Sequence, residues 1–147
     1  RATLKAADAS QIDGWWDKEP FDAILLDLPC SATGVIRRNP DVRLMRSEES
    51  LRSLLSMQIM ILDATWQTLC EGGRMLVTTC SILPRENDVQ IEKFLDRHPD
   101  ASVQQITHVP GLATSFGIQQ LPDHAGGDGF YYALLVKSGP ASDGVFA

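Results

Sequence analysis

The sequence predicts an α/β fold with a mostly parallel sheet that ends in an antiparallel strand pair. Two near-continuous apolar runs, residues 21–28 and 74–79, are typical of strands buried on both faces of a parallel sheet. A long amphipathic pattern lies between them, so strand and helix alternate along the chain. Two late β-forming segments, residues 102–106 and 130–136, have no helical pattern between them, which indicates that they pair antiparallel.

The first part of the chain is expected to begin with a short strand at residues 2–8. A polar and irregular segment, residues 11–20, then leads to the buried strand at residues 21–28. Residues 31–46 contain turn formers and show no clear period, which predicts a loop.

The amphipathic helix is expected to begin after Ser47, a good N-cap, and Glu48 and Glu49 suit the positive end of the helix dipole. Gly72 and Gly73 are expected to end it. This places Cys70 in the last helical turn, where we expect it to belong to the core. The apolar residues at helical spacing are Leu51, Leu54, Leu55, Ile61, Leu62, Trp66 and Leu69.

The second helix is expected to start at Pro84, since proline suits the first helical position, and to end before Pro99. One domain at residues 1–137 is the natural interpretation of this length. The remaining expected elements are a strand at residues 102–106, a long loop at 108–127, a strand at 130–136 and a mobile tail at 138–147.

Composition excludes several classes of protein. The chain has 147 residues, 44% of them hydrophobic, and no apolar run long enough for a membrane span or a signal peptide. Its three cysteines are odd in number and widely spaced, which favours a reducing, cytoplasmic location over a disulfide framework. No clustered cysteines or histidines indicate a metal site. The net charge of −6 argues mildly against a nucleic-acid partner.

The distribution of basic residues, however, leaves such a partner open. Five of the 13 basic residues fall in one short segment that begins a few residues after Cys30. This segment is either a solvated surface or a patch that contacts phosphates, and composition favours neither. The five residues are Arg37, Arg38, Arg43, Arg46 and Arg52.

Two cysteines stand just past the two buried strands. Cys30 follows the first strand and Asp27, and Cys80 follows the second. In open α/β sheets, ligands bind outside the carboxyl ends of the strands. Two thiols and a carboxylate at this edge therefore suggest covalent chemistry on a bound substrate, although a buried structural role is the commoner one for a single cysteine.

Three segments resemble motifs of the RNA cytosine-5 methyltransferases, the Sun family. Asp27 to Gly34 (DLPCSATG) is similar to the Asp-x-Pro-Cys-Ser-x-x-Gly motif, Thr79 to Ser81 (TCS) to the second cysteine motif, and Gly127 to Ala133 (GDGFYYA) to the late strand motif. Cys30 to Asp41 (CSATGVIRRNPD) most resembles the bacterial 16S ribosomal RNA enzymes of this family, the Sun/Fmu group. The resemblance runs from about residue 7 to residue 137 and implies a Rossmann-like fold that uses S-adenosylmethionine.

The resemblance also implies a role for each matching residue. Cys80 corresponds to the nucleophile that attacks C6 of cytosine, and Cys30 to the thiol that assists release of the adduct. Asp27 corresponds to the acid that contacts the cytosine ring near the methionine end of the cofactor, and Asp8 to the acid on its adenine side. The implied partner is ribosomal RNA, with Arg37, Arg38 and Arg43 as phosphate contacts.

One departure from the family is the absence of its Gly-rich cofactor loop, since no Gly-x-Gly-x-x-Gly occurs in this sequence. The chain begins at what would be the third strand, so we expect a C-terminal part of the catalytic domain that is inactive alone. The segment Ala23 to Asp27 would then be an exposed apolar edge, because the family's first strand pairs there. We expect dimerisation or aggregation through such an edge. Alternatively, the first strand of this chain is displaced and pairs with it.

Two other functions stay open. An amino-group methyltransferase carries an Asp/Asn-Pro-Pro-aromatic motif at the same strand end, which residues 27–30 resemble loosely and without the aromatic. Such an enzyme needs no thiol, so a stable adduct with RNA containing 5-fluorocytosine would distinguish the two. The third hypothesis is a non-catalytic RNA-binding or assembly module, which calorimetry with S-adenosylmethionine tests.

Overall fold

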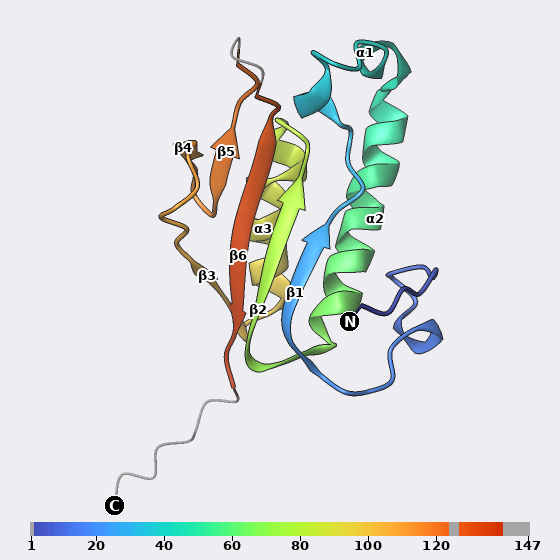
Figure 1. Ribbon diagram of the computed structural model, residues 1–147, viewed down its shortest axis with the longest axis vertical. Coiled ribbons are helices and arrows are strands. Elements are labelled where there is room, and N and C mark those ends of the chain that lie inside the picture. Colours follow the sequence, from blue (N-terminus) through green and yellow to red (C-terminus); the bar gives the residue numbers. More distant parts are fainter. Residues whose placement is uncertain (1, 124–126, 140–147) are drawn as a thin grey trace, which may run out of the picture.

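The computed structural model describes residues 2–123 and 127–139, and its centre is a sheet that runs through the molecule (Figure 1). The strand order is β1-β2-β6-β5-β4, and β3 also pairs with β6. The described strands are β1 (Phe21–Asp27), β2 (Leu69–Thr79), β3 (Ala101–Gln104), β4 (Leu112–Ala113), β5 (Ile118–Gln120) and β6 (Phe130–Lys137).

Strand directions confirm the predicted fold class. β1 and β2 pair in parallel, whereas β6 pairs antiparallel with β2, β3 and β5. It follows that β1, β2, β3 and β5 all run one way and β6 runs against them. The pairing of β3 with β6 is the expected antiparallel pair at the end of the chain.

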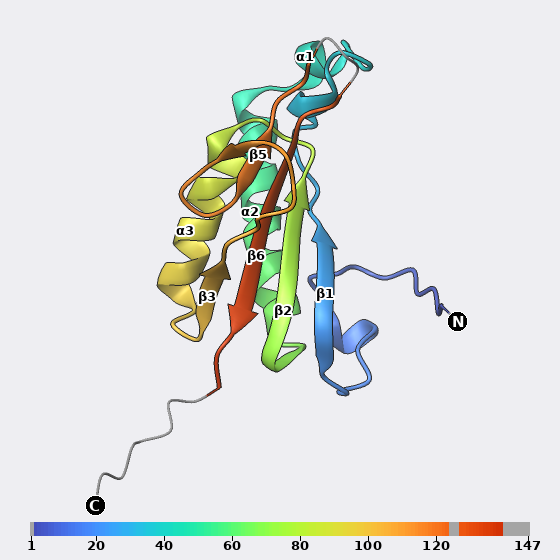
Figure 2. The same ribbon diagram turned by 60° about the vertical axis from the view of Figure 1, so that its left-hand side comes forward.

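Two helices, α2 (Glu48–Trp66) and α3 (Asp88–Arg97), lie against one face of the sheet (Figures 1 and 2). Trp66 of α2 and Phe94 of α3 meet edge to face, with 5.2 Å between ring centroids, and both are almost fully buried. Alternate residues of β6, among them Leu135, point into the same core. Both helices therefore hold the central strands β2 and β6 from one side.

Helix α2 begins as predicted but ends earlier. Ser47 caps it, and Ser50 returns the bond in a capping box. The helix ends at Trp66 rather than at Gly72, because Lys137 donates to the carbonyl oxygens of Trp66 and Leu69, and β2 begins at Leu69. The expectation of a core helical position for Cys70 is wrong, since that residue is half-buried in β2.

The expected strand at residues 2–8 is absent. A strand needs a partner for its backbone groups, and β1 pairs with β2 on one side while this segment makes no ladder with it. Instead, Lys5 donates to the carbonyl oxygen of Trp15 at 2.7 Å. The open edge of β1 in the described structure agrees with the expected exposure, and Leu25 is 71% exposed there.

Two expected loops contain short regular elements. The loop expected at residues 31–46 holds the 3-10 turn η2 (Thr33–Val35) and the helix α1 (Val42–Met45). The loop expected at residues 108–127 holds β4 and β5, because this segment completes the sheet beyond β6. Two more 3-10 turns are η1 (Ile12–Gly14) and η3 (Pro84–Glu86), so the second helix region starts at Pro84 as a 3-10 turn.

The two ends of the chain are described only in part. Ser138, the first residue of the expected mobile tail, donates its backbone N–H to Asp100 at 2.7 Å. Residues 140–147 of that tail lie outside the described residues. None of the helices within residues 2–123 and 127–139 has the length and apolar character that crossing a membrane requires.

Candidate active site

The parallel pairing of β1 and β2 brings the two predicted thiols together. Asp27 and Thr78 are partners in the ladder, so the chain leaves both strands at the same edge of the sheet. Beyond that edge, the Sγ atoms of Cys30 and Cys80 lie 3.4 Å apart, and both cysteines are free. Segments fifty residues apart in the sequence therefore form one dithiol site.

The contact between the two thiols makes them chemically different. The contact with Cys30 lowers the pKa of Cys80 to about 7, even though burial and the charges of Asp27 and Glu86 act in the opposite direction. The same contact raises the pKa of Cys30, and burial adds to this increase. Of the two, Cys80 is therefore the thiol that loses its proton more readily, and Cys30 the one that keeps it.

Asp27, the predicted acid, closes β1 next to these thiols. Its Oδ1 accepts a hydrogen bond from the Thr78 hydroxyl at 3.1 Å, and the side chain is exposed. One carboxylate oxygen is therefore fixed to β2 while the group as a whole stays accessible from solvent. Such a group can accept hydrogen bonds from a ligand at this edge of the sheet.

Gly34 joins three sequence motifs at this site. Its N–H donates to the carbonyl oxygen of Cys80 at 2.9 Å, and its own carbonyl oxygen accepts from the N–H of Gly129 at 2.8 Å. A Cβ at position 34 would collide with the Gly129 carbonyl and lie 2.8 Å from the oxygen of Cys80. The late strand motif thus packs through Gly129 on the two cysteine loops, and only glycine fits at position 34, where these segments cross.

Glu86, a carboxylate that is 1% exposed, bonds to residues adjacent to both thiols and was not among the predicted site residues. Its two oxygens accept hydrogen bonds from Ser31, Ser81 and Gln58. From the sequence alone, an acid two residues after Pro84 is typical of an exposed first helical turn, so its pattern gave no signal of burial. Its role became visible only from its partners.

The arginines expected to contact RNA, Arg37, Arg38 and Arg43, are all exposed, and the segment that carries them also bonds to the rest of the protein. Arg38 donates to Asp128 from both Nε and Nη2, with Nε 2.9 Å from Oδ2, and this ion pair lowers the pKa of the Asp128 carboxyl. Arg46 donates to the carbonyl oxygen of Ser31 at 2.8 Å. Arg37 and Arg43 are exposed, with Arg43 on α1. The segment therefore supports the Cys30 loop as well as presenting positive charge.

The structure does not join Asp8 to the thiols. Its Oδ1 accepts from the N–H and hydroxyl of Ser10, and these bonds lower the pKa of the exposed Asp8 carboxyl. Its backbone carbonyl accepts from the indole N–H of Trp15. Asp8 thus closes a local turn in the segment before η1, away from the contacts of Asp27.

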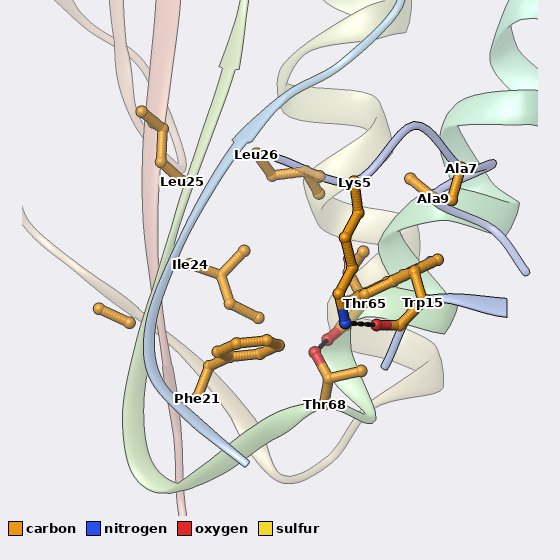
Figure 3. A pocket seen from close by; sticks show the side chains of 11 residues that line it. Lys5, Ala7, Ala9, Trp15, Phe21, Ile24, Leu25, Leu26, Thr65 and Thr68 are labelled. Atoms are coloured by element: carbon orange, nitrogen blue, oxygen red, sulfur yellow. Dashed lines mark hydrogen bonds between the residues drawn. The ribbon is translucent and has the colours of Figure 1, made fainter. Parts of the chain in front are cut away.

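A cavity of about 370 Å³ lies beside β1, between that strand, the N-terminal segment and the end of α2 (Figure 3). Apolar side chains including Trp15, Phe21 and Ile24 line it, and neither thiol nor Asp27 does. The cavity is therefore separate from the dithiol site. Within the described ranges, no group of three or more His, Cys, Asp or Glu residues could hold a metal ion.

Comparison with solved structures places this fold among the Rossmann-like methyltransferases. A structure described as NSun6 from Pyrococcus horikoshii with SFG superposes with a TM-score of 0.79 at 25% identity, over 94% of this chain and 35% of that one. A methyltransferase homologue, also from Pyrococcus horikoshii, has a TM-score of 0.73 at 24% identity, over 89% of this chain and 43% of that one, which supports the fold alone.

Sequence comparison identifies the family. The sequence model described as 16S rRNA methyltransferase RsmB/F matches residues 1–136, so the chain belongs to this family. Ribosomal RNA small subunit methyltransferase B of Xylella fastidiosa is 51% identical over 93% of this chain and 32% of its own length. The protein of the same name from Pseudomonas putida is 48% identical over 92% of this chain and 31% of its own. The chain thus spans about a third of these relatives.

Proposed function

We propose that this chain carries the catalytic thiols of an enzyme that methylates cytosine C5 in ribosomal RNA. The observation that supports this most directly is the 3.4 Å contact of Cys30 and Cys80, in which Cys80 has a pKa lowered to about 7. A thiolate available near neutral pH and a thiol that holds its proton are the two groups such chemistry needs. The names of the relatives supply the expected substrate, a small-subunit ribosomal RNA.

The chemical step begins with Cys80. Cytosine C5 is a weak nucleophile because the ring is aromatic, and addition of the Cys80 thiolate to C6 makes C5 enamine-like. After C5 carries its methyl group, water takes the C5 proton, the electron pair of that C–H bond restores the C5–C6 double bond, and the bond between Sγ and C6 breaks, which returns the Cys80 thiolate. Cys30 assists this release by donating a hydrogen bond to the departing sulfur.

S-adenosylmethionine, when bound, supplies an electrophilic methyl group. Asp27 fits the role of a cofactor contact, because its exposed carboxylate at the end of β1 can accept from a positively charged ammonium group. Asp8 is exposed as well, and its Oδ2 makes no hydrogen bond within the described residues. We assign the methionine end to Asp27 and the adenine side to Asp8.

The RNA contacts follow from the exposed basic residues. Arg37 and Arg43 are exposed on the segment after Cys30 and carry the phosphate contacts in this proposal. Arg38, whose side chain is 58% exposed, belongs to the same set of phosphate contacts and also fixes Asp128 to this segment. The proposed reaction needs Cys80 and Cys30 as free thiols, which a reducing compartment maintains, so we infer a cytoplasmic location.

The proposal is tested with cysteine variants in the whole protein that carries this chain. Cys80→Ala should abolish methylation of small-subunit RNA, because the nucleophile is removed. Cys30→Ala should accumulate a covalent RNA adduct, visible as a shifted band on a denaturing gel.

Cys70→Ala is the control, since Cys70 lies in β2 and should leave turnover unchanged. Methylation by the Cys80 variant would contradict the proposal. RNA with 5-fluorocytosine should form a stable adduct with the wild type, whereas an amino-group methyltransferase forms none.

A further inference from the structure

One buried carboxylate takes no part in the mechanism above. Glu86 closes η3, is 1% exposed and accepts four hydrogen bonds. Its Oε1 accepts from the Ser31 N–H at 2.8 Å and from Gln58 Nε2 at 3.1 Å. Its Oε2 accepts from the hydroxyls of Ser31 and Ser81, each at 2.5 Å.

The donors are the immediate neighbours of the two thiols. Ser31 follows Cys30, and Ser81 follows Cys80. A single oxygen of Glu86 therefore bonds to both cysteine loops at once, directly next to the sulfur-bearing residues. Since the two loops leave different strands, this shared acceptor fixes their relative position at a point where the sheet no longer does.

The surroundings hold the carboxylate in this orientation. Gln58 of α2 also donates to the Pro29 carbonyl at 2.9 Å, and Gln90 of α3 donates to the Gln58 oxygen at 3.0 Å. Both helices thus fix the amide that bonds to Glu86. The two oxygens of a carboxyl group accept these four converging hydrogen bonds, which no amide or hydroxyl side chain of this size can do.

We propose that Glu86 is a positioning residue that holds the Cys30 and Cys80 loops at the sulfur-to-sulfur separation required for adduct formation and release. The proposal rests on the proposed function for its consequence in catalysis. Its structural part, the fixed distance between the thiols, is independent of any activity. This allows the two proposals to be tested separately.

The first experiment measures the thiol pair directly. Phenylarsine oxide condenses with two neighbouring thiols, forms two As–S bonds and releases water, and mass spectrometry follows the product. Glu86→Ala should slow this reaction about tenfold or more, because loops released by even an ångström seldom present both sulfurs together. Glu86→Gln keeps one oxygen acceptor and should be intermediate.

Tyr131→Phe is the matched control. It removes a buried hydrogen bond of 2.7 Å to Asp88 without touching either cysteine loop, so it should leave the arsenical reaction unchanged. Each variant is assayed at a temperature chosen so that the free energy of unfolding is the same for all variants. An unchanged rate in folded Glu86→Ala, or an equal loss in Tyr131→Phe, would overturn the proposal.

If Glu86→Ala fails to fold, the serines provide the same information. Ser31→Ala and Ser81→Ala each remove one donor to Oε2, and each should slow the arsenical reaction less than the loss of the carboxylate. When either serine variant is combined with Glu86→Gln, the arsenical reaction should slow little further, because both substitutions disrupt the same hydrogen bond to Oε2. Full additivity, or no effect of either serine, would contradict the shared role.

The second experiment measures turnover in the whole protein. Glu86→Gln should lower kcat for RNA methylation with KM for RNA nearly unchanged, since the RNA contacts are elsewhere. A rise in KM at constant kcat would overturn the positioning role. If the wild type does not methylate RNA, the proposed function fails, while the arsenical rates still decide the role of Glu86.

Discussion

At the scale of single residues, the two cysteines acquire different roles from one contact. Burial alone would raise the pKa of both thiols, and the carboxylates of Asp27 and Glu86 add to this for Cys80. The hydrogen bond from Cys30 outweighs these effects at Cys80 and adds to them at Cys30. Two chemically identical side chains therefore differ in how readily they lose a proton, which is the difference that the proposed reaction requires.

A pH profile tests this difference. The rate of Cys80 alkylation by iodoacetamide should rise with pH around a pKa of about 7, because only the thiolate reacts. In Cys30→Ala the bond that lowers the pKa is lost, so the profile should move to higher pH. Peptide mapping by mass spectrometry separates the sites, and Cys70 serves as an internal reference.

The direction in which the pH profile shifts in Cys30→Ala decides whether the contact controls the pKa of Cys80. A profile that stays in place in Cys30→Ala, or moves to lower pH, would show that the contact does not control Cys80. A second variant, Cys30→Ser, restores a hydroxyl donor and should return part of the displacement.

At the scale of elements, the site is a junction of loops rather than the end of one strand. The loop after β1 crosses the end of β2 and the start of β6 at Gly34, where backbone meets backbone. Ala32, just before this crossing, has a positive φ of 61°, a backbone conformation that residues other than glycine rarely adopt. The tight path of this loop is therefore part of how Cys30 reaches Cys80.

Gly34→Ala tests the importance of this crossing. The added Cβ meets the carbonyl oxygens of Gly129 and Cys80, so the loops must separate. We expect a loss of about 1–3 kcal/mol in the free energy of unfolding, as for overpacked sites. Thermal denaturation gives the stability, and the arsenical reaction reports on the thiols.

Gly14→Ala is the control, because a Cβ at position 14 meets nothing within 4 Å. It should change both measurements little. Equal effects of the two substitutions would show that Gly34 is not a close-packed position.

At the scale of the whole molecule, one edge of the sheet is open within the described residues. β1 pairs with β2 only, Leu25 on it is 71% exposed, and the apolar cavity of about 370 Å³ adjoins it. Exposed apolar edges pair readily with other chains. We therefore predict that the isolated chain associates through this edge.

Sedimentation velocity over a range of concentrations tests the association. The wild-type chain should show a sedimentation coefficient that increases with concentration. Leu25→Lys should reduce this increase, because a charge on an edge strand opposes pairing. Leu112→Lys, at the far edge on β4 where Leu112 is 59% exposed, should have no effect. A monomer at all concentrations would contradict the prediction.

Periodicity and local chemistry predicted the elements that depend on local signals. Ser47 caps α2 as expected because a cap requires only a few neighbouring residues. The end of α2 and the position of Cys70 in a strand were not predictable from local signals. They depend on the hydrogen bond from Lys137 to the Trp66 carbonyl oxygen and on the pairing of β1 with β2, which both involve residues distant in the sequence. The strand expected at residues 2–8 failed for the same reason, since a strand exists only with a partner.

The sequence by itself determined the fold class, the two cysteine motifs at strand ends and the family they resemble. These follow from alternating apolar patterns and from residues that stand next to one another in the chain. Only the tertiary structure decided that the sulfurs are 3.4 Å apart, that Cys80 has the lower pKa, and that Glu86 bonds to both loops. The physical reason is that such distances and desolvation arise between segments fifty residues apart, which no local pattern records.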